Sequence, residues 1–496
     1  MSLIQISHLT FAYDGSYDVI FEDVSFQLDT DWKLGFTGRN GRGKTTFLKL
    51  LLGKYEYQGK ITSSVTFDYF PFEVAQKQRN TMEIIEELVP DCEYWQIKKE
   101  LSLLDVKEDI LWRPFCHLSN GEQTKVLLSA LFLKENHFLL IDEPTNHLDT
   151  LGRKTVSNYL KNKKGFILVS HDRQFLDDSI DHILSINKQN IEVQKGNFTS
   201  WQQNKQKQDS FELSENEKLK REIQSLSAAA KRTANWSNKV EKTKKTGKDS
   251  SGLRPDRGYI GHKAAKMMKR SQVITSRKET AIEEKSKLLK NIEQEQDLKL
   301  SPSRYHKQIL LEVKEVSLFY GQKRVFEPVT FSIEKGDRIA LQGGNGTGKT
   351  SLLKWILGEK IAFEGQIQKG SGLEISYVSQ DTSTLNGTLQ EYAQKETINY
   401  SLFLGILRKL GFAREQFEKG IEDFSGGQKK KVLLAKSLCQ KAHLYIWDEP
   451  LNFIDVLSRI QIETLLLEYQ PTMIFVEHDA IFTQKIATKL IELKKA

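Results

Sequence analysis

The hydrophobic pattern divides the chain into three parts. Apolar runs of strand length, such as residues 138–141 and 166–169, occur before residue 201, and similar runs return after residue 303. Strand-length runs followed by helical patterns are typical of α/β domains. No run approaches the roughly 20 apolar residues that cross a bilayer, and the N-terminal segment does not have the pattern of a signal peptide. The pattern predicts two α/β regions, and we expect the mature chain to start near Met1.

The middle part has a helical pattern. Residues 202 to 300 are rich in Lys, Gln, Glu and Ser. A glycine-rich stretch at 244–261 separates two narrow apolar stripes. The stripes consist of Phe211, Leu219, Ile223, Leu226 and Ala230, and of Met267, Ile274, Ala281 and Leu288. We expect two antiparallel helices of about 30 to 35 residues, each reaching on the order of 50 Å at about 1.5 Å per residue.

The two α/β regions are copies of each other. The sequence GRNGRGKTT at 38–46 recurs as GGNGTGKTS at 343–351. Lys44 precedes Ser119 by 75 residues, and Lys349 precedes Ser425 by 76. Such self-similarity indicates a repeated domain, and the matched spacing argues against a large insertion in one copy. Because 18 residues follow His478, we expect no C-terminal domain. The fold class is therefore α/β, with tandem P-loop domains at 1–201 and 304–496 and a basic, α-helical hairpin linker at 202–303.

Each repeated motif fits the phosphate-binding pattern GxxxxGK[ST]. A strand-like segment precedes it and a helical pattern follows, as the motif requires. Backbone N–H groups of the loop and the helix N-terminus attract phosphate oxygens, Lys44 and Lys349 reach the β and γ phosphates, and Thr45 and Thr350 are placed to hold Mg²⁺. Two copies in this context argue against chance glycine turns. The predicted nucleotide-binding residues are Gly38, Asn40, Gly41, Gly43, Lys44, Thr45 and Thr46, and Gly343, Asn345, Gly346, Gly348, Lys349, Thr350 and Ser351.

Two acidic pairs end apolar strands at 137–142 and 443–448. They are Asp142-Glu143 and Asp448-Glu449. The Asp can polarise Mg²⁺ or its water shell, and the Glu can orient and deprotonate an attacking water. Alone, Asp-Glu-Pro is as often an ordinary strand end. Its matched distance from a phosphate loop in both halves favours catalysis.

Two further motifs return in both halves. Ser119 and Ser425 each open a helical stretch 23 residues before the acidic pair, so a hydroxyl and free N–H groups face a γ-phosphate. Ser-Gly alone is also an ordinary helix cap. His171 and His478 follow apolar strands, where a His can contact the γ-phosphate, although a lone His is more often structural. The predicted residues of these motifs are Ser119, Gly121, Ser425, Gly426, Gly427, His171 and His478.

Charge and cysteine content narrow the function. The net charge is +8, and residues 201–300 hold 24 Lys plus Arg against 14 Asp plus Glu. Residues 231–278 alone hold 15 basic and 3 acidic side chains, which favours phosphate contacts with RNA, although a generic charged linker is more often simply solvated. The three cysteines are widely spaced, which argues against a disulfide framework or a zinc cluster and fits a reducing cytoplasm.

Over essentially its whole length, the chain resembles the ATP-binding cassette ATPases, whose Walker A, signature, Walker B and switch-histidine motifs it carries twice. The resemblance implies ATP and Mg²⁺ as cofactors, adenine stacking by Tyr13 and Tyr320, and D-loops at Asp149 and Asp455. It also implies that each nucleotide is sandwiched between the Walker A motif of one cassette and the signature of the other. Lys44 would then share a site with Ser425, and Lys349 with Ser119. Metal-site residues would be Thr45, Asp142, Thr350, Gln380 and Asp448.

Tandem cassettes with a charged helical linker and no membrane domain resemble the ABC-F class. Its members act on ribosomes, and the linker hairpin enters the exit-tRNA site and contacts tRNA and rRNA. The stretch 252–270 is similar to that of the Lsa and Vga resistance proteins, which implies protection from lincosamides, pleuromutilins and streptogramin A. We expect a cytoplasmic monomer whose cassettes close on each other. The predicted RNA-binding residues are Lys242, Lys244, Lys245, Lys248, Arg254, Arg257, Tyr259 and Lys263.

Alternatives remain open. One is a housekeeping translation factor without drug phenotype, and another is the ATPase subunit of a transporter whose membrane subunits are separate chains. A DNA-repair or chromosome-organising ATPase would need zinc-binding cysteines or a far longer coiled coil.

The two halves depart from the family pattern in different ways. Phe72 stands where Gln380 stands in the second copy, so the first cassette lacks the Q-loop glutamine. Asn120 and Glu122 alter the first signature, and the loop after the second acidic pair reads Leu-Asn-Phe453 in place of Thr-Asn-His. We therefore expect two chemically unequal sites.

Overall fold

The computed structural model describes residues 2–13, 19–90, 92–146, 148–186, 191–246, 298–412 and 414–496, with single helical positions between 262 and 280. Only the backbone is described for residues 226, 229–246 and 415. The chain forms two units. Residues Met1–Trp201 and Glu295–Ala496 make one unit, which contains both cassettes, and Gln202–Gln294 makes the other.

The first cassette contains two sheets. A six-stranded sheet has the order β5-β6-β7-β3-β8-β9, in which only the β8–β9 pair is antiparallel. A three-stranded antiparallel sheet has the order β2-β1-β4. The strands are β1 Leu3–Ala12, β2 Val19–Asp29, β3 Lys33–Thr37, β4 Gln58–Thr62, β5 Thr66–Phe70, β6 His137–Asp142, β7 Phe166–Val169, β8 His182–Ile186 and β9 Ile191–Lys195.

The second cassette repeats this architecture. A parallel sheet has the order β15-β16-β17-β13-β18, and an antiparallel sheet joins β10, β11, β12 and β14. The strands are β10 Ile309–Tyr320, β11 Lys323–Arg324, β12 Val329–Glu334, β13 Arg338–Gln342, β14 Ala362–Lys369, β15 Ile375–Val378, β16 Leu444–Asp448, β17 Met473–Val476 and β18 Lys489–Glu492. β3 and β13 match the strands expected before the phosphate loops.

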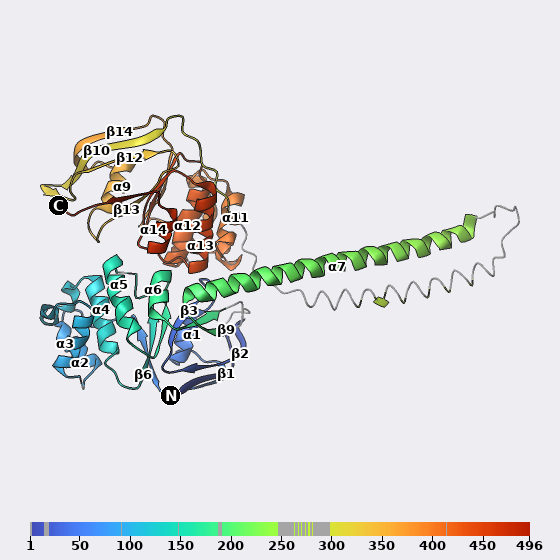
Figure 1. The fold of residues 1–496 in the computed structure, drawn as a ribbon, viewed down its shortest axis with the longest axis horizontal. Helices are drawn as coiled ribbons and strands as arrows, with labels where there is room; N and C mark the ends of the chain where they lie inside the picture. The colour runs from blue at the N-terminus through green and yellow to red at the C-terminus, as the bar shows by residue number, and fades with distance from the viewer. Residues whose placement is uncertain are drawn as a thin grey trace. The chain divides into compact units, whose positions relative to one another are not determined.

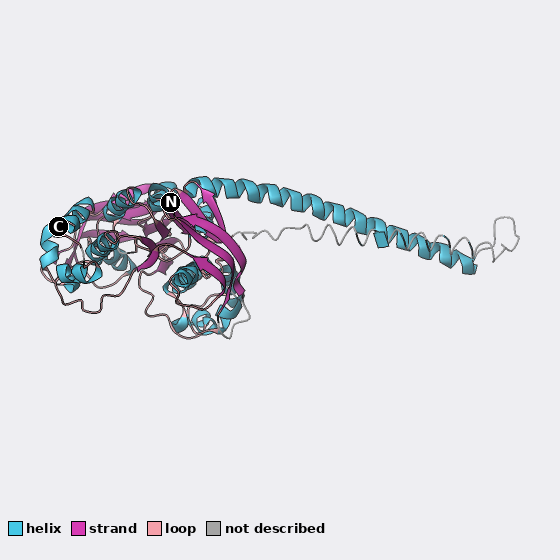
Figure 2. Cartoon of the chain, turned by 90° about the horizontal axis from the view of Figure 1, so that it is seen from below, coloured by secondary structure: helices cyan, strands magenta, loops and turns pink. Residues whose placement is uncertain are grey.

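Helices lie against these strands (Figures 1 and 2). Those of the first cassette are α1 Lys44–Leu51, α2 Thr81–Leu88, α3 Tyr94–Leu103, α4 Asn120–Leu131, α5 Thr150–Lys161 and α6 Arg173–Ser179, with short 3₁₀ helices at Glu108–Trp112 and Phe115–His117. Those of the second are α9 Lys349–Leu357, α10 Leu389–Lys395, α11 Tyr400–Lys409, α12 Gly426–Cys439, α13 Val456–Tyr469 and α14 Ala480–Ile486, with 3₁₀ helices at Arg414–Glu418 and Ile421–Asp423.

Each cassette has two hydrophobic cores. In the first cassette, every residue of β7 and all but the first residue of β3 are buried, as expected for parallel strands covered on both faces. One core packs α1 against the two sheets, and the other packs α2 to α6 against the opposite face. Val456 of α13 is buried in this second core of the first cassette. Apolar packing therefore joins the cassettes.

The linker begins with one continuous helix, α7, from Phe198 to Thr246 (Figure 2). Its 49 residues exceed the 30 to 35 that we expected. Phe198 and Trp201 anchor its start in a core of the first cassette. The expected second helix and the glycine-rich turn fall largely outside the described residues.

Candidate functional site

The two phosphate loops have the same backbone geometry. Gly43 and Gly348 adopt φ values of 91° and 88° directly before α1 and α9. A Cβ atom at these positions would lie 2.5 Å from Ile20 and 2.3 Å from Val325, respectively. Neither helix has a side-chain cap, so its first N–H groups are free for phosphate oxygens.

The loop lysines fold back over their own loops. Lys44 Nζ donates to the carbonyl oxygens of Gly38 and Arg39, at 2.6 and 3.3 Å. Lys349 Nζ donates to those of Gly343 and Gly344, at 2.8 and 2.9 Å. Burial lowers the pKa of both lysines. A bound phosphate would replace these carbonyl contacts with a charge-assisted one.

The Asp of each acidic pair ends a strand beside its phosphate loop. Asp142 Oδ2 accepts hydrogen bonds from Thr45 Oγ1 at 3.2 Å and from Tyr69 OH at 2.9 Å. Burial raises the pKa of Asp448 to about 6, and the Thr350 hydroxyl partly offsets this rise. Neither carboxylate oxygen of Asp448 has a geometrically good hydrogen bond within the described part of the chain.

The two catalytic-base candidates lie in different surroundings. His171 Nε2 approaches Glu143 Oε1 at 3.3 Å, and His478 Nε2 approaches Glu449 Oε1 at 3.5 Å. Burial, and then the charge of Asp142, raises the pKa of Glu143 to about 8.

At Glu449 the balance is reversed. Burial alone would raise its pKa, but hydrogen bonds from His478 and Gln380 hold it below the ordinary value. Gln380 Nε2 donates to Glu449 Oε2 at 2.9 Å, and Asn452 Nδ2 donates to the same oxygen at 2.5 Å. The residue at the Gln380 position in the first cassette, Phe72, packs against the hydrophobic core instead.

The Walker A motif of the second cassette and the signature of the first line one cavity. This cavity, which we call site 2, has a volume of about 990 Å³. Ser119 and Gly121 line it together with Lys349, Gln380 and Glu449. Ser119 caps α4, and its Oγ also donates to Glu122 Oε2 at 2.7 Å. The signature serine of this site is therefore hydrogen-bonded to a carboxylate.

The complementary pairing gives a smaller cavity of about 340 Å³, which we call site 1. Its lining includes Asn40, Glu143 and His171 from the first cassette and Ser425 from the second. Asn40 Nδ2 donates to the carbonyl oxygen of Phe453 at 2.9 Å. The loop after the second acidic pair thus touches the phosphate loop of the other cassette.

The expected adenine-stacking tyrosines lie at the rims of the loops. Tyr13 OH lies 2.7 Å from Thr46 Oγ1, and Tyr320 OH donates to Ser351 Oγ at 3.1 Å. Both rings are partly exposed, at 42% and 57%. Tyr320 lines the site 2 cavity, so its ring is available to a base bound there.

Comparisons with known proteins agree with this geometry. A family model described as "ABC transporter" matches residues 21–146 and 326–452, about half of the chain. The chain belongs to the ABC transporter family. This confirms the expected fold of two tandem ABC-type cassettes and makes the protein an ATPase. Among the helices that the structure describes, none is long and apolar enough to cross a membrane.

Several relatives of this ABC protein match nearly its full length. "Ribosome protection protein VmlR" of Bacillus subtilis (strain 168) is 29% identical, covering 96% of this chain and 84% of VmlR. "ATP-binding protein Uup" of Buchnera aphidicola subsp. Acyrthosiphon pisum is 26% identical, covering 99% of this chain and 80% of Uup. These relatives support the ABC-F class.

A solved structure shares the fold. It is the archaeal ribosome recycling factor aABCE1 in complex with the ribosomal stalk protein aP1. Its TM-score to this chain is 0.63 at 19% sequence identity, and the match covers 98% of this chain and 87% of that one.

The oxygen-rich pairs of both sites fit Mg²⁺. Thr350 and Asp448 supply a hydroxyl and a carboxylate, and Thr45 and Asp142 supply the same pair in site 1. Hard oxygen ligands and few protein donors suit a magnesium ion that also binds nucleotide phosphates. The buried Asp448 oxygens, which lack a good hydrogen bond among the described residues, fit a cation partner.

Sequence reasoning missed an arginine that supports each site. Arg153 Nη1 donates to Asp172 at 2.8 Å, and Arg459 Nη1 donates to Asp479 at 3.2 Å. Each aspartate directly follows a switch histidine, and each arginine lies four residues after a D-loop aspartate. The identical spacing in both copies was a signal that could have identified these arginines.

The predicted RNA-binding residues are only partly described. Lys242, Lys244 and Lys245 lie in the last turns of α7, where only the backbone is described. The other predicted contacts, Lys248, Arg254, Arg257, Tyr259 and Lys263, lie outside the described residues. Their role stays a prediction.

Proposed function

We propose that this ABC-F ATPase binds ribosomes in the cytoplasm as a monomer and uses its linker to contact RNA. Site 1 and site 2 each combine residues from both cassettes, so two bound ATP molecules with Mg²⁺ hold the cassettes closed. In this state the linker hairpin enters the exit-tRNA site. Hydrolysis then releases the protein.

The observation that best supports this proposal is that one chain joins two such nucleotide sites to a strongly basic helical linker. Residues 231–278 hold 15 basic and 3 acidic side chains, and α7 carries the first of them on a continuous helix. Lysine and arginine contacts with phosphates give affinity with little sequence readout. The similarity to a ribosome protection protein supports the choice of RNA.

We further propose the Lsa/Vga-type activity, in which the hairpin protects the peptidyl-transferase centre from lincosamides, pleuromutilins and streptogramin A. The relative VmlR supports it. The protein would then raise the concentrations of lincomycin and tiamulin that inhibit growth, with the Lys44→Ala/Lys349→Ala variant, which cannot hold phosphate, as the inactive control. Unchanged inhibition by both drugs would refute the resistance function and leave the ribosome proposal standing.

A housekeeping translation factor is the second candidate. It remains open because Uup, which matches over 99% of this chain, is named as an ATP-binding protein and not as a ribosome protection protein. It requires ribosome binding without any change in drug tolerance, so the same growth measurement separates the two. If the protein is instead the ATPase subunit of a transporter with separate membrane subunits, it should co-purify with membrane proteins and not with rRNA.

Trapping tests the ribosome proposal. The Glu143→Gln/Glu449→Gln variant keeps the phosphate loops but loses both bases, so it should remain closed in ATP and sediment with ribosomes. A variant with Lys44→Ala and Lys349→Ala, which cannot hold phosphate, should stay free. If the glutamine variant also sediments free of ribosomes in ATP, ribosome binding is not its function.

A further inference from the structure

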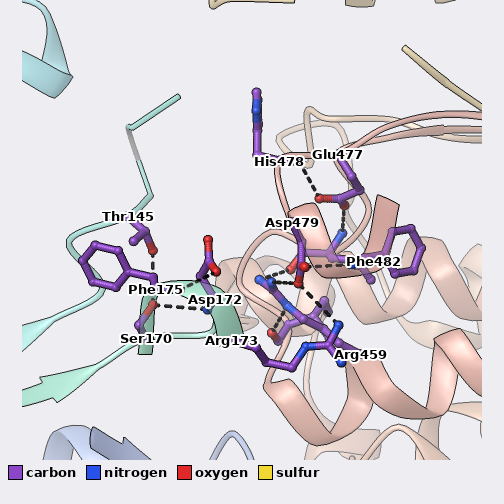
Figure 3. A network of polar contacts seen from close by, with 12 residues as sticks. Thr145, Ser170, Asp172, Arg173, Phe175, Arg459, Glu477, His478, Asp479 and Phe482 are labelled. Atoms are coloured by element: carbon purple, nitrogen blue, oxygen red, sulfur yellow. Dashed lines mark hydrogen bonds and ion pairs between the residues drawn. The ribbon is translucent and has the colours of Figure 1, made fainter. Parts of the chain in front are cut away.

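A buried ion-pair network crosses between the cassettes. Arg173, the first residue of α6, donates to Glu463 of α13 through both terminal nitrogens, with one contact at 3.1 Å. Its Nη2 also lies 3.8 Å from Asp479 Oδ2. The three side chains are 3%, 4% and 1% exposed. Figure 3 shows Arg173 extending towards Asp479 and Arg459.

The network leads from Arg173 into site 1. Asp479 also accepts from Arg459 Nη1 at 3.2 Å. Arg459 in turn donates to the carbonyl oxygens of Leu451 and Ile454, at 2.8 and 2.9 Å. These residues flank Phe453, whose carbonyl oxygen binds the phosphate loop of site 1.

The network residues also lie next to both switch histidines in the sequence. Arg173 lies two residues after His171, which lines site 1. Asp479 directly follows His478, which lines site 2. A movement of either histidine strand is therefore carried to the same cluster of buried charges.

Among the residues that the structure describes, the cross-cassette contact exists on one side only. The position equivalent to Arg173, two residues after the second switch histidine, is Ala480. The position equivalent to Glu463, eight residues after the first D-loop aspartate, is Ser157. Ser157 is buried and accepts a hydrogen bond from Ser179 within its own cassette. By contrast, the Arg–Asp pairs within each cassette occur in both copies.

We propose that Arg173 is a positioning residue for ATP hydrolysis. It holds Asp479 and Arg459 of the opposite cassette so that the 451–454 loop seats against the phosphate loop of site 1. Unpairing a buried ion is costly because the remaining charge keeps its desolvation penalty. Arg173 therefore ties the geometry of site 1 to complete closure. This role concerns ATP hydrolysis and does not depend on the ribosome.

Three variants test this role. Arg173→Met should lower kcat for ATP by on the order of 10- to 100-fold, as expected when a change far from the chemistry misplaces the reacting groups, with little change in ATP affinity of the open protein. Lys485→Ala is the matched control, because Lys485 contacts the same Glu463 at 3.5 Å but is 52% exposed. It should keep the rate of the unmodified protein.

The double variant Arg173→Met/Glu463→Met separates positioning from simple stability. It leaves no unpaired charge at the Glu463 position, so closure, measured as the distance between one spin label on each cassette, should recover at the ATP concentration that closes the unmodified protein. The rate should stay low because Arg173 no longer holds Asp479 and Arg459 in position. Full recovery of the rate, or an unchanged rate in Arg173→Met, overturns the proposal.

Arg173→Lys replaces Arg173→Met if thermal unfolding shows that the latter does not fold. Lysine keeps the charge but cannot span both carboxylates. The same loss of rate is then expected, and an unchanged rate again overturns the role.

Discussion

The unequal surroundings of the two bases predict that hydrolysis at site 1 depends on pH above neutrality and that hydrolysis at site 2 does not. Glu143 is buried beside Asp142, and its pKa is about 8. The rise from the ordinary value corresponds to on the order of 5 kcal/mol in favour of the neutral acid. Glu449 receives hydrogen bonds from Gln380 and Asn452, and its pKa lies below the ordinary value. At neutral pH only Glu449 is predominantly in the form that accepts a proton.

The direction of the pH dependence follows from the role of a general base, which acts when it is deprotonated. For a pKa of about 8, about one tenth of Glu143 is ionised at pH 7 and about nine tenths at pH 9. Hydrolysis at site 1 should therefore rise about tenfold over this interval. Hydrolysis at site 2 should be flat, because Glu449 is already ionised.

Single-site variants make the two rates separable. Glu449→Gln leaves site 1 as the hydrolysing site, and Glu143→Gln leaves site 2. Phosphate release is followed in a single turnover with Mg²⁺-ATP between pH 6.5 and pH 9 at constant ionic strength, and the double glutamine variant gives the background. If both single variants show the same pH dependence, the assigned difference between the two glutamates is wrong.

Three further outcomes follow from the site geometry. Gly43→Ala should destabilise the protein by about 1 to 3 kcal/mol, because a non-glycine residue is strained at positive φ and its Cβ would meet Ile20. Gly41→Ala, also at positive φ but in open space, should destabilise it less. Thermal unfolding measures both changes. Gln380→Ala removes one donor to the site 2 base, so the acid limb of the pH profile for site 2 alone should move to higher pH. Tyr320→Ala should raise the KM for ATP at site 2 by about tenfold, as expected for loss of about 1 to 2 kcal/mol of base stacking, with little effect on kcat.

Most of the fold could be predicted from the repeated motifs because each motif requires particular secondary structure on either side of it. The strands expected before the two phosphate loops are β3 and β13, and both acidic pairs lie at the ends of buried strands. A phosphate loop needs a strand before it and a helix after it, so its sequence also determines its neighbours. The pairing of Walker A and signature across cassettes came from family resemblance and not from the residues themselves.

Long-range contacts could not be predicted in the same way. Arg173 and Glu463 are 290 residues apart, and nothing in either local pattern distinguishes them from surface charges. Tyr69 reads as an ordinary strand residue, yet its hydroxyl binds Asp142. The length of α7 was underestimated, although no Gly or Pro occurs between Gly196 and Gly247 to end the helix. There the breaker residues were a better guide than the narrow apolar stripes.

The one-sided contact at Arg173 has a consequence for how such proteins diversify. In a homodimer with twofold symmetry, every interfacial contact occurs twice and every substitution is felt on both sides. Joining two cassettes in one polypeptide removes that constraint, so one half can gain an arginine while the other keeps an alanine. Genetic fusion thus allows a machine with an intrinsic direction to arise from two formerly identical parts.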